Sequence, residues 1–405
     1  MISSSKLPAG WQIKSIGSFS KVTTGATPLR AKHDRYFTGG NIPWIKTTDL
    51  NNSDIVDCEE NITELAVKEN SCSVLPENTV LVAMYGGFRQ IGRTGILRMP
   101  AATNQALSAI RVNEKEVTPY FLLHYLNENV SQWKRLAASS RKDPNITRQD
   151  VLDYEVVLPP LFQQEKIVAI ASTWDNAIAL ELRHLQQLRQ RKKEIARSLL
   201  SQELRLAGFH DKWELVPLRL LFQRVTRPNH RRAIKVMSIT ARRGFESQDE
   251  KFSRVIAGEN IAKYVLLQKD EFAYNKGNSG LHPYGVIYKL EEDEAAVPNV
   301  YLSFKGNAET DAEFYQHYFL SGAINSQLSR VINSGVRNDG LLNLSAEDFF
   351  NVSVHRVPLA EQRAIAELLN TADAEIKLHE RQLEALREQK RGLLQKLLNG
   401  EILLS

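Results

Sequence analysis

The sequence predicts an α+β protein with two tandem mixed α/β domains, each followed by one long helix, and with the two helices forming an antiparallel coiled coil. Two observations lead to this fold class: a long internal duplication, and apolar residues that step by three and four along the end of each copy. The duplication implies pseudo-twofold symmetry. The expected boundaries are 1–158 for the first domain, 159–207 for the central helix, 208–356 for the second domain and 357–405 for the C-terminal helix.

The duplication relates residues 143–203 to residues 341–401. The two stretches align without a gap, and 19 of their 61 positions are identical. Unrelated stretches of ordinary composition would share about 4 positions. Each copy is also longer than a solenoid repeat of roughly 20–50 residues. The repeated unit is therefore a domain together with its helix.

Each copy ends in a predicted long helix. Pro160 and Pro358 stand where a proline is tolerated in the first turn, because its missing N–H would be unpaired there anyway. Helices of about 40 residues, or ~60 Å, should follow. We expect them to end near Gly208 and near Gly400, since glycine favours helix ends. The expected coiled-coil contacts are Trp174, Ile178, Leu185, Leu188, Ile195 and Leu199 in the first helix, and Ile376, Leu383, Leu386, Leu393 and Leu397 in the second.

The apolar stripe admits polar residues at the same two places in both copies. Glu181 and Lys192 of the first helix match His379 and Lys390 of the second. This repetition predicts that the helices pack in a fixed register, although a common ancestor alone also explains it. An ordinary helical hairpin inside a core is the alternative, and the basic run over residues 183–197 is interpreted as a solvated face.

The two domains themselves show strand and helix signals in a similar order. Residues 79–84, 285–288 and 300–304 are rich in β-branched and aromatic residues and are bounded by turn residues, so they are predicted strands. Residues 119–126 and 312–319 have the character of shorter helices. Both domains are therefore predicted to be mixed α/β.

The composition is that of a soluble globular protein, with 42% apolar and 24% charged residues. No stretch approaches the ~20 apolar residues of a membrane-spanning helix, and the N-terminus lacks the features of a secretory signal. We therefore expect a cytoplasmic protein without a membrane partner. The two cysteines, Cys58 and Cys72, make a disulfide scaffold or a cysteine zinc site unlikely. A net charge of +5 permits a polyanionic partner without demonstrating one.

No catalytic constellation is evident in the sequence. It contains no phosphate-binding loop of the G-x-x-x-x-G-K type, no G-x-G-x-x-G between a strand and a helix, and no H-E-x-x-H. We therefore expect no catalytic residue, no metal site and no cofactor bound by this chain.

The domains instead carry polar, glycine-rich loops suited to DNA. Arginine and lysine can bridge guanine and asparagine or glutamine can bridge adenine, whereas threonine and serine suit phosphates. Any one such loop could equally be a plain turn, but comparable loops occur at comparable places in both halves. The candidates are Lys46, Thr47, Thr48, Tyr85, Arg89, Arg93, Asn104, Gln105, Arg141 and Lys142 in the first domain, and Arg242, Arg243, Tyr274, Lys276, Asn278, Ser279, Arg337 and Asn338 in the second.

Several of these stretches resemble the specificity subunits of type I restriction-modification enzymes. In that family, two target recognition domains alternate with two spacer helices, and the resemblance covers essentially the whole chain. The matching stretches are residues 40–50, 83–86, 91–93 and 100–106 in the first half, 272–276, 284–285 and 298–301 in the second, the helix openings 160–165 and 358–363, and the ending 397–402.

The resemblance implies a non-catalytic subunit that reads a bipartite double-stranded DNA target. Because the two domains share little sequence, the two half-targets would differ. Methyltransferase and restriction subunits would be the partners, and they would supply S-adenosylmethionine, ATP and Mg. The paired helices would act as a ruler between the half-targets.

Two other hypotheses remain open from the sequence. A fused nuclease or methyltransferase would methylate or cut DNA on its own once a cofactor is added. A coiled-coil interaction scaffold would show no preference for any DNA sequence.

Overall fold

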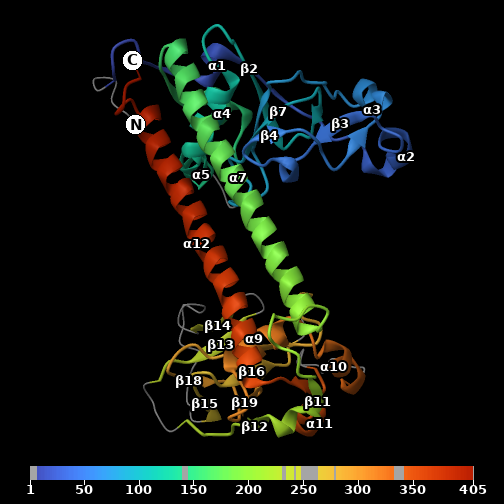
Figure 1. The fold of residues 1–405 in the computed structure, drawn as a ribbon. Helices are drawn as coiled ribbons and strands as arrows, with labels where there is room; N and C mark the ends of the chain where they lie inside the picture. The colour runs from blue at the N-terminus through green and yellow to red at the C-terminus, as the bar shows by residue number, and fades with distance from the viewer. Residues whose placement is uncertain are drawn as a thin grey trace. The chain divides into compact units, whose positions relative to one another are not determined.

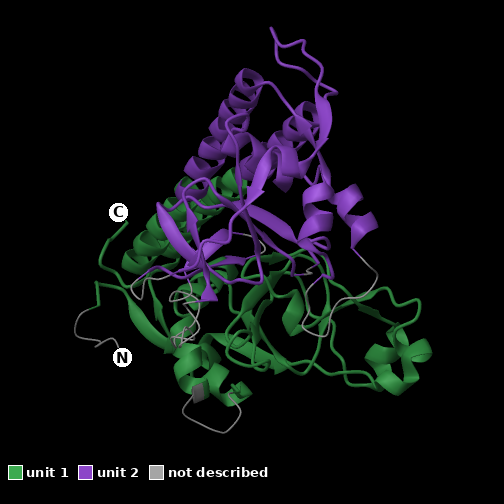
Figure 2. Cartoon of the chain, turned by 90° about the horizontal axis from the view of Figure 1, so that it is seen from below, with its two compact units in different colours: residues 1–182, 382–405 green, residues 183–381 purple. Residues whose placement is uncertain are grey.

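The chain was described from a computed structural model (Figure 1). It divides into two compact units (Figure 2). Unit 1 comprises residues 1–182 and 382–405, and unit 2 comprises residues 183–381. The structure describes residues 7–138, 145–229, 234–240, 243–247, 263–277, 280–332 and 342–404.

Each unit contains one mixed α/β body and parts of two long helices. The helices are α7 (Leu161–Leu200) and α12 (Leu359–Leu398), and each has 40 residues. They begin directly after Pro160 and Pro358, as the position of these prolines predicts. The predicted α+β class with two long packed helices is confirmed.

The predicted end of the first helix near Gly208 is wrong, because α7 ends at Leu200. Gln202 follows in a left-handed conformation, with φ 66°, and Gly400 takes the same place after α12, with φ 74°. Glycine is the usual residue at such a helix end. In the first copy a glutamine takes that position, so a search for glycine overshoots the true end.

The long helices run antiparallel within each unit. In unit 2, Lys192 Nζ lies 2.6 Å from Asp373 Oδ2, and the rings of His184 and His379 meet edge-on with centroids 4.6 Å apart. Residue numbers thus fall along α7 as they rise along α12. In unit 1, Lys390 Nζ lies 2.6 Å from Asp175 Oδ1. The two lysine–aspartate pairs occupy duplicated positions, 198 residues apart in both partners.

The stripe predicted for the coiled coil faces inward on both helices. On α7, Leu185 and Leu199 are buried, and on α12, Ile376, Leu383 and Leu397 are buried. The remaining predicted contacts, Trp174, Ile178, Leu188, Ile195, Leu386 and Leu393, are half-buried.

The first body is built on a five-stranded sheet in the order β2-β9-β6-β7-β4, in which only the β4–β7 pair is parallel. A smaller sheet has the order β5-β3-β8. The strands are β2 (Ser20–Thr24), β3 (Ile42–Ile45), β4 (Asp54–Ile55), β5 (Asn61–Ile62), β6 (Val80–Ala83), β7 (Thr94–Leu97), β8 (Ala102–Thr103) and β9 (Leu107–Val112). The helices are α1 (Ile16–Phe19), α2 (His33–Tyr36), α3 (Glu64–Glu69), α4 (Pro119–Glu128), α5 (Val130–Ala138) and α6 (Arg148–Leu152).

The second body is built on a four-stranded antiparallel sheet in the order β12-β19-β16-β17, with two further antiparallel strand pairs, β13–β14 and β15–β18. The strands are β12 (Phe222–Arg224), β13 (Met237–Thr240), β14 (Gly244–Ser247), β15 (Val265–Gln268), β16 (Phe272–Asn275), β17 (Val286–Lys289), β18 (Glu294–Val297) and β19 (Leu302–Gly306). The helices are α9 (Ala312–Leu320), α10 (Asn325–Val331) and α11 (Ala346–Asn351).

The two bodies share one strand order. The succession β2-β9-β6-β7 in the first corresponds to β12-β19-β16-β17 in the second, and every neighbouring pair in both is antiparallel. Helix α4 packs on β6 and β7, and α9 packs on β17. The duplication therefore extends into regions where the two sequences share little.

Each body is joined to its long helix through duplicated contacts. Strands β1 (Gln12–Ser15) and β10 (Glu155–Leu158) pair antiparallel, as do β11 (Glu214–Pro217) and β20 (Ser353–Arg356). The indole of Trp11 donates to Gln163 Oε1 at 2.8 Å, and the indole of Trp213 donates to Glu361 Oε2 at 2.8 Å.

The core of each unit includes both long helices. In unit 1, Leu394, Leu397 and Leu398 of α12 join the buried cluster of the first body. In unit 2, Leu199 and Leu200 of α7 join the cluster of the second body. Full burial of a leucine is worth about 1.5–3 kcal/mol, so these contacts tie both helix ends firmly to the bodies.

Candidate nucleic-acid interface

The predicted DNA-binding loops of the first body meet at one end of its main sheet. The backbone N–H of Asn104 donates to Ile45 O at 3.0 Å, and that of Met84 donates to Ala106 O at 2.8 Å. Ile146, which follows residues 139–144, donates to Met84 O at 3.0 Å. The loops at 46–48, 85–93 and 103–105 are therefore neighbours, and the chain re-enters the body beside them. Arg141 and Lys142 lie outside the described residues.

The β6–β7 loop is the most exposed part of this cluster. Tyr85, Phe88 and Arg89 all have exposed side chains. Gly86 and Gly87 have φ 109° and φ 73°, a left-handed conformation that favours glycine. The sequence therefore holds the loop in a tight turn that presents an arginine and two aromatic rings to solvent.

The other candidates in this cluster are partly engaged within the protein. Arg93 Nη1 donates to Gln90 Oε1 at 2.9 Å, and Asn104 Oδ1 accepts from Ala106 N at 3.2 Å. The Thr27 hydroxyl donates to Gln105 Oε1. Thr47 is half-buried and Thr48 is exposed, in a short 3-10 turn over Thr47–Asp49.

The prediction of Lys46 as a DNA contact needs correction. Its Nζ lies 2.7 Å from both Glu59 Oε2 and Glu60 Oε1, and its side chain is only 16% exposed. Hydrogen bonds from Arg30 and Lys46 lower the pKa of Glu60 to about 2. Lys46 is thus neutralised by two carboxylates, which the sequence pattern Lys46-Thr47-Thr48 does not reveal because both acids come from another segment.

Three candidates of the second body, Arg243, Tyr274 and Lys276, belong to the described residues, and they lie near the equivalent end of its sheet. Asn275 Nδ2 donates to Ile239 O at 3.3 Å, beside the β13–β14 turn. Leu342 N donates to Lys276 O at 2.9 Å, and Lys276 Nζ donates to Leu344 O at 3.5 Å. Arg243 is exposed at the β13–β14 turn, 3.3 Å from Glu246. Arg242, Asn278, Ser279, Arg337 and Asn338 lie outside the described residues.

The prediction of Tyr274 as a DNA contact is wrong in this conformation, because its side chain is fully buried. Its hydroxyl donates to Tyr284 O at 2.6 Å, and its ring stacks on Phe349 with centroids 5.0 Å apart. Burial raises the pKa of the Tyr274 hydroxyl. The run Phe272-Ala273-Tyr274 is buried throughout, and its continuous apolar character was the signal for a core strand.

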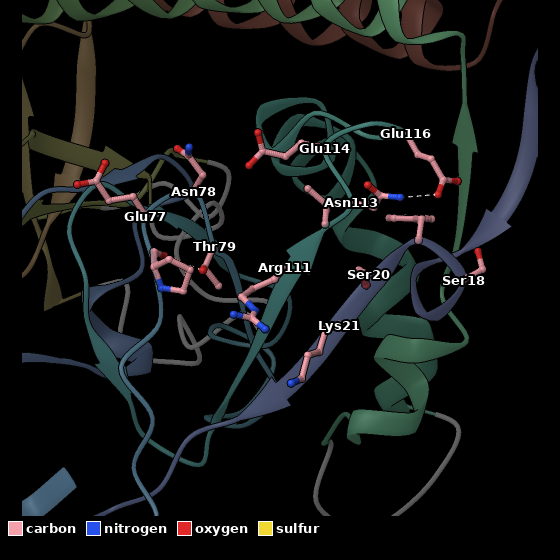
Figure 3. Close-up of a pocket in the computed structure, with 13 residues that line it drawn as sticks. Ser18, Ser20, Lys21, Glu77, Asn78, Thr79, Arg111, Asn113, Glu114 and Glu116 are labelled. Carbon is pink, nitrogen blue, oxygen red and sulfur yellow. Dashed lines mark hydrogen bonds between the residues drawn. The ribbon is translucent and has the colours of Figure 1, made fainter.

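A separate cavity of about 530 Å³ opens at the other end of the first body's sheet (Figure 3). Lys21 and Arg111, which pair across β2 and β9, line it together with Glu77 and Glu114. Its charges are mixed, and the predicted loops do not reach it. Among the described residues, no group of three or more histidine, cysteine or acidic side chains is placed to hold a metal ion. No helix in the described part of the chain is long and apolar enough to cross a membrane.

Phe88 is the main surface residue that sequence reasoning missed. The candidates predicted in the loop Tyr85-Gly86-Gly87-Phe88-Arg89 are Tyr85 and Arg89, and Phe88 is not among them. The signal was present in the sequence, because an aromatic residue directly after two glycines has no strand or helix in which to be buried.

Two bodies with the same strand order and two antiparallel 40-residue helices define an internally duplicated protein. Residues 8–190 match the family described as the type I restriction modification DNA specificity domain. The resemblance to type I specificity subunits that the sequence indicated is thereby confirmed.

Relatives and solved structures agree with this assignment. The MjaIX specificity subunit of Methanocaldococcus jannaschii is 30% identical over 43% of this chain and 40% of its own length. The EcoR124I/EcoR124II specificity subunit of Escherichia coli is 26% identical over 46% of this chain and 47% of its own length. The chain thus aligns with less than half the length of these two relatives. The putative MjaX specificity subunit of M. jannaschii is 21% identical over 98% of this chain and 95% of its own length.

The fold is also found in known type I systems. A chain from a structure on complex assembly and conformational transition of the type I R-M system superposes with a TM-score of 0.61 at 14% identity, covering 98% of this chain and all of that one. The type I restriction-modification S subunit from M. genitalium superposes with a TM-score of 0.54 at 15% identity, covering 98% and 97%. At these identities the likeness concerns the fold.

Proposed function

We propose that this chain is the specificity subunit of a type I restriction-modification enzyme and reads a bipartite DNA target, one half with each body. The observation that carries the proposal is that the described candidate residues lie at the same end of the same sheet in both bodies. Base-edge readers and phosphate-binding groups must act together, since phosphate contacts position a protein and base contacts specify the sequence.

The two half-targets are proposed to differ. The first body offers Arg89 and Gln105 at its loops, whereas the second offers Arg243. Different side chains at equivalent places hydrogen-bond to different base edges. An asymmetric target follows from this difference.

The chain is proposed to act without catalysing a reaction, in the cytoplasm. Its partners would be methyltransferase and restriction subunits, with S-adenosylmethionine, ATP and Mg bound by those subunits. The names of the relatives as specificity subunits of restriction enzymes support this assignment.

Selection from a random duplex pool tests the proposal. The full-length chain, with and without its methyltransferase subunit, is incubated with the pool at stated salt, because phosphate contacts make affinity strongly salt-dependent. We expect a motif of two unlike halves separated by an unread spacer. Recovery of unselected sequences under both conditions would favour a scaffold without DNA readout.

Two arginine variants assign the halves. Arg89→Ala should relax specificity in one half-target and Arg243→Ala in the other, each by roughly 5- to 150-fold for one base contact of 1–3 kcal/mol. Exposed Arg98→Ala, outside the loop cluster, is the control. Loss of both halves in either single variant would contradict the assignment of one half to each body.

A further inference from the structure

Each body exposes one apolar side chain at the same place in the same hairpin. Phe88 is 50% exposed in the loop between β6 and β7, and Leu281 is 55% exposed in the loop between β16 and β17. Each stands four residues before a left-handed glycine, Gly92 with φ 76° and Gly285 with φ 74°.

The two glycines occupy similar places in their hairpins, although Gly285 N donates to His282 O, at 3.1 Å, instead of to the first strand. Gly92 N donates to Ala83 O, the last residue of β6, at 3.0 Å. A Cβ on Gly285 would lie 2.6 Å from the carbonyl oxygen of Asn275, the last residue of β16. Both glycines therefore lie against the end of the first strand, and the positions of Phe88 and Leu281 are structurally equivalent.

The residue before each apolar side chain is also the same. Gly87 precedes Phe88 and Gly280 precedes Leu281, and a Cβ on either glycine would meet nothing within 4 Å. Space within the protein therefore does not require a glycine at Gly280. A glycine lets the backbone approach a ligand closely. Both loop tips, at Phe88 and at Leu281, therefore have little steric bulk beside the apolar side chain.

Single exposed apolar residues are common and need no explanation. Phe88 and Leu281 differ from such residues because they recur at one position in two bodies of divergent sequence. They also lie in the loop clusters that hold the candidate DNA-binding residues, with the exposed Arg89 directly beside Phe88. An apolar tip that recurs in both bodies, and that has a cation beside it in the first, fits a ligand that has both flat apolar surfaces and negative charge.

We propose that Phe88 and Leu281 are apolar wedges, each of which inserts at a base step of the half-target read by its body. The inference rests on the proposed function and adds how the target is read. Phenylalanine and leucine are among the side chains that unstack base steps, at a cost of a few kcal/mol per step. Because pyrimidine–purine steps open most easily, each wedge reads the deformability of its step, and we expect one such step in each half.

The test uses the full-length chain with its methyltransferase subunit and duplexes carrying the selected target. Phe88→Ala should reduce discrimination at one base step of one half by roughly 5- to 150-fold, the range of 1–3 kcal/mol per base pair, and leave the other half unchanged. Leu281→Ala should do the reverse. With 2-aminopurine at the affected step, wild-type binding should raise the fluorescence through unstacking, and the corresponding variant should not.

The duplication supplies matched rescue variants. Phe88→Leu and Leu281→Phe each install the residue that the other body uses, and both should retain the discrimination and most of the fluorescence change. Val56→Ala and Leu215→Ala remove exposed apolar groups elsewhere in the same two bodies, and neither should alter either half.

The outcomes distinguish a failure of the proposed function from a failure of the wedge alone. A wild-type chain that selects no sequence would overturn both the function and the wedge. A wild-type chain that selects a bipartite target, with alanine variants that keep the same target and fluorescence, would overturn the wedge alone. Alanine variants that lose the methyltransferase subunit but keep the target would assign the tips to a protein partner, which also overturns it.

Discussion

Two buried glutamines fasten the bodies to the long helices residue by residue. Gln164 Nε2 donates to Glu116 O and Pro159 O, each at 2.9 Å, and its Oε1 accepts from Thr118 N at 2.9 Å. Gln362 repeats this set on Glu309, Val357 and Asp311, at 2.6–2.7 Å. Thr118 and Asp311 are the N-cap residues of α4 and α9. One side chain thus holds the start of each body helix against the start of each long helix.

Replacing either glutamine should destabilise its unit. Gln164→Ala or Gln362→Ala leaves an N–H and two carbonyl groups unpaired, and we expect a loss of at least about 3 kcal/mol, because each unpaired buried group costs roughly 1–3 kcal/mol. Thermal unfolding measures the loss, with exposed Gln187→Ala as the control. A melting temperature equal to that of the control would contradict the role given to these glutamines.

Replacing Gln202 with glycine should increase the stability of unit 2. A side chain in the left-handed region costs roughly 1–2 kcal/mol, and Gln202 gains in return a contact of 3.3 Å between its Nε2 and His355 Nε2. We therefore expect Gln202→Gly to stabilise unit 2 by roughly 0.5 kcal/mol. Gly400→Ala is the reciprocal variant and should destabilise, because its Cβ would lie 2.7 Å from Pro8 Cγ. A lower melting temperature for Gln202→Gly would show that the histidine contact outweighs the strain.

Among the structural elements, α4 and α9 each turn one buried histidine toward the long helices. Burial, reinforced by Lys390, lowers the pKa of His124 to about 4, against the opposing effects of Asp175 and Asp54. Burial also lowers the pKa of His317, whose Nε2 lies 2.8 Å from Asn370 Oδ1, with Lys192 lowering it further and Asp373 and Glu313 opposing. The duplicated lysine–aspartate pairs therefore lie in the surroundings of both histidines.

Acid should weaken the packing of α4 and α9 against the long helices, because His124 and His317 are buried there in the neutral form. A histidine with a folded pKa below its unfolded value of about 6.5 stabilises fully above that value, and this stability is lost as the pH falls toward the folded pKa. For His124 the window runs from about 6.5 to about 4, and the loss at pH 5 is roughly 2 kcal/mol. Burial raises the pKa of the neighbouring Glu128, so that carboxyl works in the opposite sense.

The variant His124→Gln tests this pH dependence. We expect a smaller fall in melting temperature between pH 7 and pH 5 than in the wild type, because the glutamine does not titrate. His210→Gln, at an exposed position, is the control. An undiminished fall in His124→Gln would mean that other groups set the acid sensitivity.

The elements that could be predicted from the sequence were those with a long or regular signal. The stepping of leucines located α7 and α12, and aromatic and apolar runs located α4, α9, β6 and β19. Whether Lys46 and Tyr274 remain available to contact DNA could not be predicted in the same way. Glu59 and Glu60, which neutralise Lys46, and Phe349, which covers Tyr274, belong to other segments of the chain. Residue type suggested a site, but tertiary contacts decided which side chains remain available.

For the whole molecule, the proposed function gives the long helices the role of setting the spacer between half-targets. Seven residues inserted after Leu188 and seven after Ile376 would lengthen both helices by about 10 Å at 1.5 Å per residue, and would keep the period of the coiled coil. We expect a spacer longer by about 3 base pairs, at 3.4 Å each, and unchanged half-targets. Duplex selection with this variant gives the answer.

An insertion of a different length serves as the control for the seven-residue variant. Five residues at the same two places rotate the apolar stripe by about 140°, at 3.6 residues per turn, and should impair folding instead of resetting the spacer. Unchanged spacing with altered half-targets in the seven-residue variant would refute the ruler role of the helices.

The inclusion of α12 leucines in the first body's core bears on how the chain is made. The first body leaves the ribosome before the second, but Leu394, Leu397 and Leu398, which complete its apolar cluster, are translated only after the second body. Nascent domains generally fold from the N-terminus onward, and uncovered apolar surface promotes aggregation. The apolar cluster of the first body therefore stays partly exposed until α12 has been synthesised. A chain that terminates before α12 would leave this cluster exposed.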